Sequence, residues 1–381
     1  MKSINMNVFW MTAEEALAKL GTKPQTLYAN VSRGRIRAKP DPADPRRSRY
    51  HSDDVLRLAE RHSGRRQADV VAAQAIRWGD PILSTSISRI AEGRLLYRGF
   101  EASDLSASAT LEDIAKLLWQ APNADVSAGK AELQHLSRLA VAMRSLADRV
   151  TEDPPSIDRT PEALRAEAAD VLSTVAAGLA PSPDQMPLHQ RLATGWRRPE
   201  AAEPIRKSLV LAAEHELNVS AFAARVTASS GASLSAAALS GLVTLTGPRH
   251  GGAWISVMDL VRQASLVGAR EAVLRSMPFK GALRAFGHPL YPRGDPRAKV
   301  ILSSFEMPAI YASLAIEGEE LLGEPPNIDF ALAALAATFD LPDDAPLVIF
   351  ALARTVGWLA HALEQVESGH MIRPRAHYSE T

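Results

Sequence analysis

The strongest constraint on the fold is the helical periodicity of long alanine- and leucine-rich windows. Two of them are PEALRAEAADVLSTVAAGLA, residues 161–180, and APLVIFALARTVGWLAHALEQV, residues 345–366. In both, apolar residues recur at the spacing of helices that pack in a core. Segments that alternate polar and apolar residues, as half-buried strands do, are scarce after residue 65. We therefore predict a mainly α protein behind a small N-terminal domain.

Charge is distributed unevenly along the 381 residues, a length that indicates two or three domains. Residues 1–66 carry 14 Lys and Arg against 7 Asp and Glu, whereas the whole chain has 43 of each. A basic head on an acidic body predicts an anionic partner for the head. The segment SGRRQADV, residues 63–70, is the predicted hinge between them.

Several classes of protein are excluded by composition. The chain has no cysteine, so disulfides, cysteine-ligated zinc and thiol catalysis are ruled out. The first twenty residues contain no sustained apolar stretch, which predicts no signal peptide. We also find no run of about 18 apolar residues and expect no membrane span. The expectation is a cytoplasmic protein.

The basic head contains start and stop signals for short helices. Thr12 and Glu15 form a capping-box pattern, and Gly21 is placed to end that helix. Pro24 can open a second helix that runs to about residue 32. The segments RIRAKP and RRSRYH flank a turn and predict a hairpin, after which Ser52 can cap a third helix. Two helices joined by a short glycine-containing turn predict a helix-turn-helix domain over residues 1–66.

This arrangement resembles the MerR-like and excisionase-type winged helix-turn-helix domains. The resemblance implies that the second helix enters the major groove of DNA and that arginines contact phosphates. The implied recognition residues are Gln25, Thr26, Tyr28 and Asn30, and the implied phosphate contacts are Arg33, Arg35, Arg37, Arg46, Arg47 and Arg49. The alternatives are a solvated basic surface and an appendage for oligomerisation.

In the body, one histidine stands between two glycine-containing turns. The stretch TLTGPRHGGAWISVMDLV, residues 244–261, places His250 after Gly247-Pro248 and before Gly251-Gly252. The glycines remove bulk beside the imidazole, so the backbone of a ligand could approach there. The following helix would begin close by and would favour an anion and a neutral ring. An ordinary turn histidine is the alternative.

Two further stretches hold histidines that could act with His250. His215 lies in LVLAAEHELNVSAFAARV, residues 209–226, inside an apparent helical pattern where a buried core histidine would also fit. His288 lies in LRAFGHPLYPRGDPRAKV, residues 283–300, and the following proline disfavours helix at that position. Asp295 can cap the next helix, which puts Arg297 in its first turn, where a cation needs an anion to offset the helix dipole.

One acid and two arginines complete the candidate set. In EPPNIDFALAAL, residues 324–335, Asn327 is a predicted cap and Asp329 falls in the first turn, a position that acids favour anyway. Arg354 interrupts a helix that is apolar nearly all round, so its buried guanidinium must be paired. Arg373 follows near the C-terminus. Arginines that clamp carboxylates, with neutral histidines and an acid, predict a dianionic substrate and proton abstraction beside a carbonyl.

With these motifs assembled, residues 80–381 resemble the citrate synthase family. The matching stretches are TSISRIAEGRLLYRGF, AEHELNVSAFAARV, GPRHGGA, FGHPLYPRGDPRAK, PPNIDF and ALARTVGWLAHALEQ with the later IRPR. The resemblance implies an all-helical fold with a large domain over residues 68–250 and 341–381. The implied small domain covers residues 251–340 and closes over the large one.

The resemblance also implies a reaction, the condensation of acetyl-CoA with oxaloacetate to citrate and CoA. Asp329 would take the methyl proton, His250 would hydrogen-bond the enol oxygen, and His288 would polarise and protonate the oxaloacetate carbonyl. His215, Arg297, Arg354 and Arg373 would hold oxaloacetate. The family uses no metal or other cofactor and forms homodimers, in which Arg373 would reach the partner's site.

Three alternatives remain open at this point. The same motifs occur in 2-methylcitrate synthases, which accept propionyl-CoA. A DNA-binding regulator could use the synthase domain to sense a metabolite without turnover, although a pure sensor could have lost Asp329. A citryl-CoA lyase would use much the same groups in the reverse direction.

Overall fold

The computed structural model describes residues 10–42, 44–63, 83–127, 129, 136–277 and 283–374. They divide into two compact units with a boundary at Ser84–Thr85, and each is taken by itself below. We call residues 10–63 the head and residues 85–374 the body. The predicted hinge falls mostly at residues 64–70, outside the described residues.

The head is a small α+β unit. Its elements are β1 (Trp10–Met11), α1 (Ala13–Leu20), α2 (Pro24–Ser32), β2 (Ala38–Asp41), β3 (Asp44–His51) and α3 (Ser52–Ser63). The strands form an antiparallel sheet in the order β1-β3-β2, with an irregularity between Pro40 and Asp41. Its small core contains Ala16, Leu20, Leu27, Ile36, Tyr50, Val55 and Leu58.

The predicted local signals of the head are confirmed. Thr12 and Glu15 form both bonds of a capping box, and Gly21 ends α1 in the left-handed conformation at φ 59°. Pro24 is the first residue of α2, where its missing N–H costs nothing. The hairpin forms from β2 and β3, and α3 starts at Ser52.

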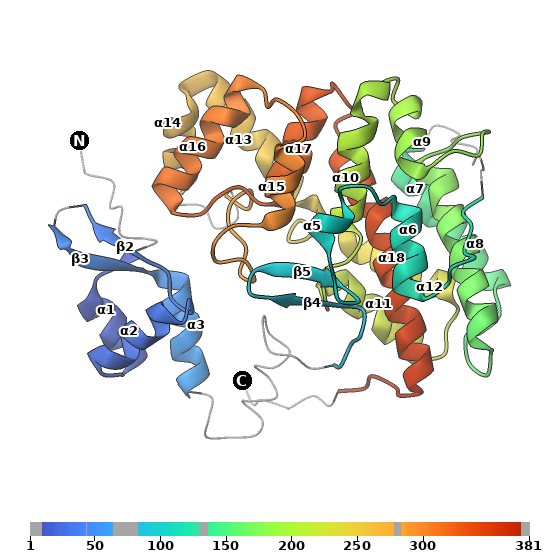
Figure 1. Cartoon of the computed structure of the whole chain (residues 1–381), viewed down its shortest axis with the longest axis horizontal. Helices are drawn as coiled ribbons and strands as arrows, with labels where there is room; N and C mark the ends of the chain where they lie inside the picture. Colours follow the sequence, from blue (N-terminus) through green and yellow to red (C-terminus); the bar gives the residue numbers. More distant parts are fainter. Residues whose placement is uncertain are drawn as a thin grey trace, which may run out of the picture. The chain divides into compact units, whose positions relative to one another are not determined.

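The body is mainly helical (Figure 1). A three-stranded antiparallel sheet opens it, with β4 (Ser88–Ala91), β5 (Arg94–Tyr97) and β6 (Phe100–Glu101) in that order. The helices are α5 (Ala102–Leu105), α6 (Leu111–Trp119), α7 (Arg138–Glu152), α8 (Pro161–Leu179), α9 (Leu188–Gly195), η3 (Pro199–Ala201), α10 (Ala202–Ala212), α11 (Val219–Ser229), α12 (Leu234–Leu245), η4 (Gly251–Ala253), α13 (Trp254–Val267), α14 (Ala269–Ser276), α15 (Pro296–Leu302), α16 (Ala309–Leu322), α17 (Ile328–Thr338) and α18 (Ala345–Ser368).

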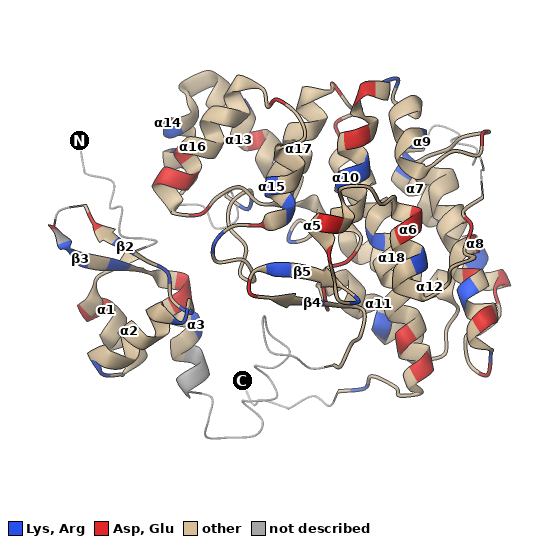
Figure 2. Cartoon of the chain, in the orientation of Figure 1, with Lys and Arg blue, Asp and Glu red and all other residues tan. Residues whose placement is uncertain are grey.

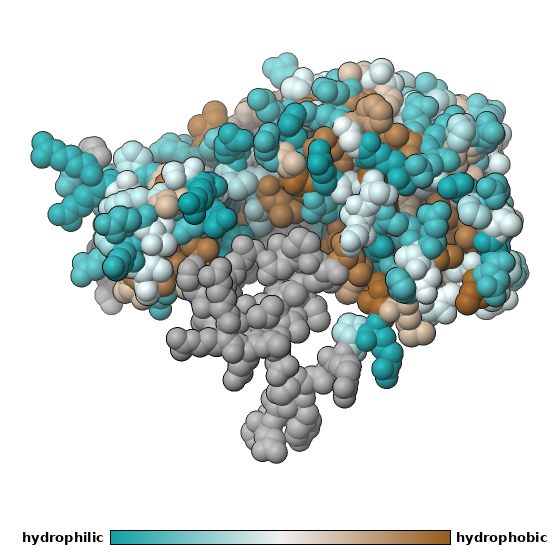
Figure 3. All heavy atoms as spheres, turned by 60° about the horizontal axis from the view of Figure 1, so that its bottom comes forward, coloured by the Kyte–Doolittle hydropathy of each residue, from teal (hydrophilic) through white to brown (hydrophobic). Residues whose placement is uncertain are grey.

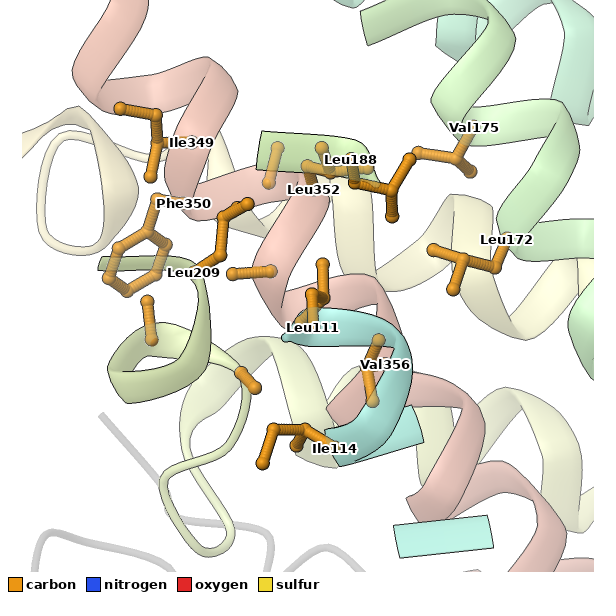
Figure 4. Close-up of a cluster of buried hydrophobic side chains, with 14 of the residues drawn as sticks. Leu111, Ile114, Leu172, Val175, Leu188, Leu209, Ile349, Phe350, Leu352 and Val356 are labelled. Atoms are coloured by element: carbon orange, nitrogen blue, oxygen red, sulfur yellow. The ribbon is translucent and has the colours of Figure 1, made fainter. Parts of the chain in front are cut away.

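The helix α18 is the central element of the larger core. In Figure 4 its side chains Ile349, Phe350, Leu352 and Val356 meet apolar residues of α6, α8, α9 and α10. Its length and apolarity would suit a membrane span, against our expectation that no such segment exists, yet most of it is buried inside the body. A helix that is apolar nearly all round packs in this way inside a large protein.

On the face in Figure 3, hydrophobic and hydrophilic side chains are interspersed over the described body.

The body contains a second, smaller hydrophobic core. It is formed by residues between Val257 and Ala334, from α13, α14, α16 and α17. The helix α17 contributes Phe330 and Ala333 to this core and Leu332 and Leu335 to the larger one, so it lies between the two. Asp329 sits at the start of this shared helix. The domain limits at 250/251 and 340/341 stay a prediction, because residues 85–374 form one compact unit.

Candidate active site

His215 lies in a connection between helices, not inside one. The helix α10 ends at Ala212 and α11 begins at Val219 after its cap Asn218, so the predicted helical setting of His215 is wrong. The helical pattern misled because Glu216, at φ 50°, turns the chain between two good helices. The ring is buried, and its Nε2 lies 2.9 Å from the hydroxyl of Tyr291. Burial, with the charge of Arg297, holds the pKa of His215 well below its usual value, so the ring is neutral.

His288 packs edge-on against His215, with ring centroids 4.9 Å apart. The backbone N–H of Leu290 donates to its Nδ1 at 3.2 Å. A neutral His288 therefore carries its proton on Nε2, which makes that nitrogen a donor. Burial and then Arg297 lower the pKa of His288 to about 4, so the neutral ring persists at neutral pH.

His250 is tied to the start of α11 through Ser220. Its Nε2 lies 2.8 Å from Ser220 Oγ, which also accepts from the indole N–H of Trp358 at 2.9 Å. The Ser220 hydroxyl donates to Asn218 Oδ1 at 2.8 Å. With its one proton used in this way, Ser220 accepts from His250, whose neutral ring then holds its proton on Nε2. Burial, followed by the charge of Arg354, lowers the pKa of His250 to about 3.

The glycines beside His250 serve packing. A Cβ added to Gly251 would lie 2.7 Å from the carbonyl oxygen of Leu245, and one on Gly252 would lie 3.1 Å from that of Gly247. The space we assigned to the backbone of a ligand is thus taken, at Gly251, by the end of α12. The Gly-Gly pair allows the turn to fold back closely on this helix and so fixes where His250 sits.

Arg297 has a partner within its own helix cap. Asp295, the N-cap of α15, accepts from Arg297 Nε at 2.9 Å and from Nη2 at 2.8 Å, and both residues are buried. Although burial alone would raise the pKa of Asp295, the Arg297 charge holds it below its usual value. Asp295 also accepts from the backbone N–H of Ile328 at 3.2 Å. This carboxylate therefore links the arginine to the start of α17, next to Asp329.

Arg354 differs because it lacks a counter-ion. Its side chain is 1% exposed, and Nε donates to the carbonyl of Ala212 at 2.8 Å. No ion pair to Arg354 forms among the described residues, although the carboxylate of Glu214 is near enough to act on its charge. Burial lowers the pKa of Arg354 to about 10, which still leaves it charged at neutral pH. A buried cation with unused N–H groups is prepared for an anionic ligand.

Asp329 lies in the first turn of α17, which Asn327 caps as predicted. In the described part of the chain its carboxylate makes no hydrogen bond or ion pair. Burial raises the pKa of Asp329 to about 7, with Asp295 adding to the rise and Arg297 and Arg354 opposing it. These two arginine charges act on both Asp329 and His215, so the four groups lie around one centre. A carboxylate with a pKa near 7 suits a general base.

Arg373 is not brought to this centre by its own chain. The neighbouring Ile372 donates its N–H to Ser229 Oγ at 3.1 Å, at the C-terminal end of α11. His250 contacts Ser220 at the opposite end of that helix, about 14 Å away along the axis. The Arg373 side chain is exposed.

The predicted DNA contacts of the head fall into two groups. Gln25, Thr26, Tyr28, Arg33, Arg35, Arg46 and Arg47 are exposed, and Arg47 pairs with Asp44 at 3.4 Å. Figure 2 shows basic residues on β3 and acidic ones on α1.

The other predicted contacts of the head are held within it. Asn30 is 5% exposed and donates to the carbonyl of Thr26, so it does not belong to an exposed face of α2. Arg37 is bound by Asp54, and Arg49 by Asp41, each at 2.8 Å. The sequence pattern could not separate these ion-paired arginines from the exposed ones.

Several residues around the centre were missed from the sequence. Ser220 and Trp358 orient His250, Tyr291 contacts His215, and His361 Nε2 donates to the carboxylate of the buried Glu214 at 3.0 Å. All five lay inside the motifs already singled out, and Glu214 is next to His215, so membership of these motifs was the available signal. The pairing of Glu214 with His361 spans 147 residues and could not be predicted from their spacing.

Comparisons with known proteins place this chain among characterised families. Residues 162–375 match the family described as "Citrate synthase, C-terminal domain". The citrate synthase of Haloferax volcanii is 30% identical over 345 residues, covering 75% of this chain and 90% of that protein. The 2-methylcitrate synthase of Shewanella oneidensis is 28% identical over 347 residues, covering 79% and 92%. The crystal structure of citrate synthase from Thermotoga maritima matches with a TM-score of 0.64 at 25% identity, covering 80% and 94%.

Proposed function

The chain belongs to the citrate synthase family, and from this premise we propose that it condenses acetyl-CoA with oxaloacetate to give citrate and free CoA. The observation that carries this assignment is the set of groups around Asp329. Two buried arginines supply fixed positive charge, three neutral histidines supply hydrogen bonds, and one carboxylate has a pKa raised to about 7. Such preorganised charge stabilises oxygen anions as they develop.

Asp329 is the proposed base of the first step. Its carboxylate takes a proton from the methyl group of acetyl-CoA, and the electron pair of the broken C–H bond forms an enol or enolate. Burial supports this role because a carboxylate with a pKa near 7 is a far stronger base than an exposed one.

His250 is the proposed partner of the enol oxygen. Nε2 is already engaged by Ser220, so the ring would have to donate from Nδ1. That tautomer forms when the ring gives up its Nε2 proton to solvent and takes one up on Nδ1, with the Ser220 hydroxyl turned from Asn218 to donate to Nε2. Ser220 would thus set the tautomer of His250 during the reaction.

His288 is the proposed donor to the oxaloacetate carbonyl. Leu290 occupies Nδ1, so Nε2–H is the donating group. The enol carbon attacks the carbonyl carbon, the new C–C bond forms, and the resulting alkoxide takes a proton through His288. Water then cleaves the thioester of citryl-CoA to release citrate and CoA.

Oxaloacetate binding is assigned to His215, Arg297 and Arg354, with Arg373 from a second copy. The unpaired, buried Arg354 gives the clearest support, because one substrate carboxylate would supply its missing counter-charge. The terminal Nη1 of Arg297 remains for a substrate after Asp295 takes Nε and Nη2. Acetyl-CoA is a substrate here, and the proposed chemistry uses neither a metal nor a cofactor.

We further propose a homodimer that is built on α11 and α12. Val219 and Val226 of α11 and Val243 of α12 are exposed apolar side chains. If α11 packs antiparallel against its copy, the end of one helix near Arg373 lies beside the start of the other near Ser220. That arrangement would deliver Arg373 to the partner's centre. Sedimentation equilibrium should then give twice the chain mass, and a monomeric synthase with full activity would refute the arrangement.

The acyl substrate is tested by measuring CoA release. Purified protein is mixed with oxaloacetate and either acetyl-CoA or propionyl-CoA. We expect a larger specificity constant for acetyl-CoA; a larger one for propionyl-CoA would make the chain a 2-methylcitrate synthase. No release from either, with oxaloacetate still raising the melting temperature, would favour the regulator that senses a metabolite.

For the head we propose DNA binding through a winged helix-turn-helix. The support is the exposed face of α2 with Gln25, Thr26 and Tyr28, followed by Arg33 and Arg35, and the absence of acidic residues from α2. We expect the full chain to retain duplex DNA with a strong salt dependence. Deleting residues 1–66 should abolish retention and leave CoA release unchanged, and equal retention would refute the proposal. We also propose that the protein is located in the cytoplasm.

A further inference from the structure

A cavity of about 440 Å³ opens in the body away from the residues around Asp329. Its walls come from the ends of α6, α11 and α18 and from the start of α8. Ser86, which precedes β4, and Arg98, which follows β5, also line the cavity. None of the residues assigned to oxaloacetate or to the proton transfers lines it. We call it the α6–α18 cavity.

Two half-buried arginines line this cavity, and neither forms an ion pair within the described residues. Arg98 donates from Nε and Nη2 to the carbonyl of Leu118, at 2.9 and 2.6 Å, and from Nη1 to Ser86 Oγ at 3.2 Å. Arg165 donates from Nε to the carbonyl of Trp119 at 3.0 Å. These consecutive carbonyls end α6, and such groups lack partners within a helix. The hydrogen bonds to these carbonyls account for the orientation of the two Nε groups. The terminal nitrogens of Arg165 have no partner among the described residues.

The cavity wall also contains a buried hydroxyl group without a hydrogen-bond partner among the described residues. Ser156 lines the cavity and is 0% exposed, and its backbone N–H is satisfied by the carbonyl of Gly231 at 3.0 Å. Its Oγ has no hydrogen-bond partner in the described part of the chain. Buried polar atoms are nearly always paired, so an unpaired one beside a cavity indicates a ligand atom that completes it.

The acidic residues of the cavity offset the charge of Arg98. Glu364 is held by Arg225 at 2.7 Å and by Ser86, and Arg159 pairs with Glu167. The remaining acids, Asp158 and Glu367, are exposed, whereas Arg98 and Arg165 are half-buried. Glu364 and Glu367 also act on the charge of Arg98, so Arg165 is the half-buried charge that remains for an anion. Trp119 and Leu164 add apolar wall that is buried.

We propose that the α6–α18 cavity is a second ligand site, which takes a small organic anion. Its carboxylate or phosphate group would lie on the terminal nitrogens of Arg165 and accept from the Ser156 hydroxyl. Its apolar body would pack on Trp119 and Leu164. The volume lies within the range of pockets for small molecules, and the wall combines apolar side chains with polar groups that can bind an anion.

The test is calorimetric titration of the full chain in the presence of oxaloacetate, which occupies Arg354 and keeps the probes from it. Benzoate and phenyl phosphate are the probes, because they share a ring and differ in the anionic group, and benzyl alcohol is the neutral control. We expect saturable binding of at least one anion with a dissociation constant on the order of 1 mM. Benzyl alcohol should show none.

Matched variants locate the binding. Arg165→Gln keeps a donor for Trp119 and removes the charge, and should weaken anion binding at least about tenfold. Ser156→Ala, which leaves packing nearly intact, should weaken it less. The control Arg262→Gln changes an exposed arginine of α13 that pairs with Asp259, and should bind like the parent chain. Absence of saturable binding by both anions, or equal affinity in all four proteins, would overturn the proposal.

Discussion

The head and the body both depend on arginine, but they place its charge in opposite environments. In the body, Arg297 and Arg354 are 2% and 1% exposed and are fixed by hydrogen bonds to Asp295 and to a backbone carbonyl. In the head, Arg33 and Arg35 are exposed, and no ion pair holds them among the described residues. Buried charge demands a partner of defined geometry, whereas exposed charge suits any polyanion. The body should therefore respond sharply to single substitutions and the exposed face of the head only gradually.

The largest effect should come from Asp329→Asn. The amide keeps the size of the side chain but cannot take the methyl proton, so kcat should fall by about 10² to 10⁴. Oxaloacetate binding should be spared, because its proposed ligands are unchanged. Stopped-flow or steady-state CoA release measures kcat, and calorimetry measures binding. The control Asp259→Asn lies on the exposed part of α13; turnover by Asp329→Asn at the control's rate would remove Asp329 from the mechanism.

The head itself offers an internal contrast between held and exposed arginines. Arg37 binds the buried carboxylate of Asp54, which also pairs with Arg57, so Arg37→Gln should destabilise the head by about 1.5–3 kcal/mol. Arg35→Gln, two residues away and exposed, should change its stability by less than about 0.5 kcal/mol. Hydrogen exchange of α1 and β3 in the full chain reports the difference. Equal exchange rates in the two variants would contradict the predicted difference between ion-paired and exposed arginines.

A pH profile gives a smaller, graded effect in the body. Burial raises the pKa of Asp329 to about 7, so the carboxylate that acts as base is lost as the pH falls through 7. The pKa values of His250 and His288 are lowered to about 3 and about 4, so neither ring changes charge in this range. We expect kcat/KM to fall about tenfold per pH unit well below 7 and to be level above 8. A profile that stays level down to pH 5 would contradict the raised pKa.

Local signals were predictable from the sequence where one residue and its neighbours decide the outcome. Thr12, Pro24, Asn327 and Asp295 cap or open helices as their side chains dictate. The motifs also placed His250 in a turn, His288 outside a helix and Asp329 in a first turn, as the structure has them. The body's helical class followed from periodicity, which α18 shows most strongly.

What could not be predicted depends on contacts between distant residues. The anion that Arg297 requires proved to be Asp295, whereas Arg354 has none in the described chain. Asn30 looked available for DNA, yet its position on the inner side of α2 buries it. The connection at His215 looked helical because helix periodicity continues on both sides of Glu216. Spacing along the chain carries no information on these pairings.

The smallest predicted effect compares the same motif in both regions. Thr12 with Glu15 and Thr110 with Asp113 form capping boxes at α1 and α6. Replacing either threonine with alanine removes the hydrogen bond that its hydroxyl accepts from the backbone N–H three residues later. We expect this loss to lower the stability of the unit by about 1 kcal/mol. A small domain has a small unfolding entropy, so Thr12→Ala should lower the melting temperature of the head by about 4–8 °C. Thr110→Ala should lower that of the much larger body by about 2–4 °C or less. Differential scanning calorimetry of the full chain resolves both transitions if the units unfold independently, and equal shifts in one shared transition would show that head and body unfold together.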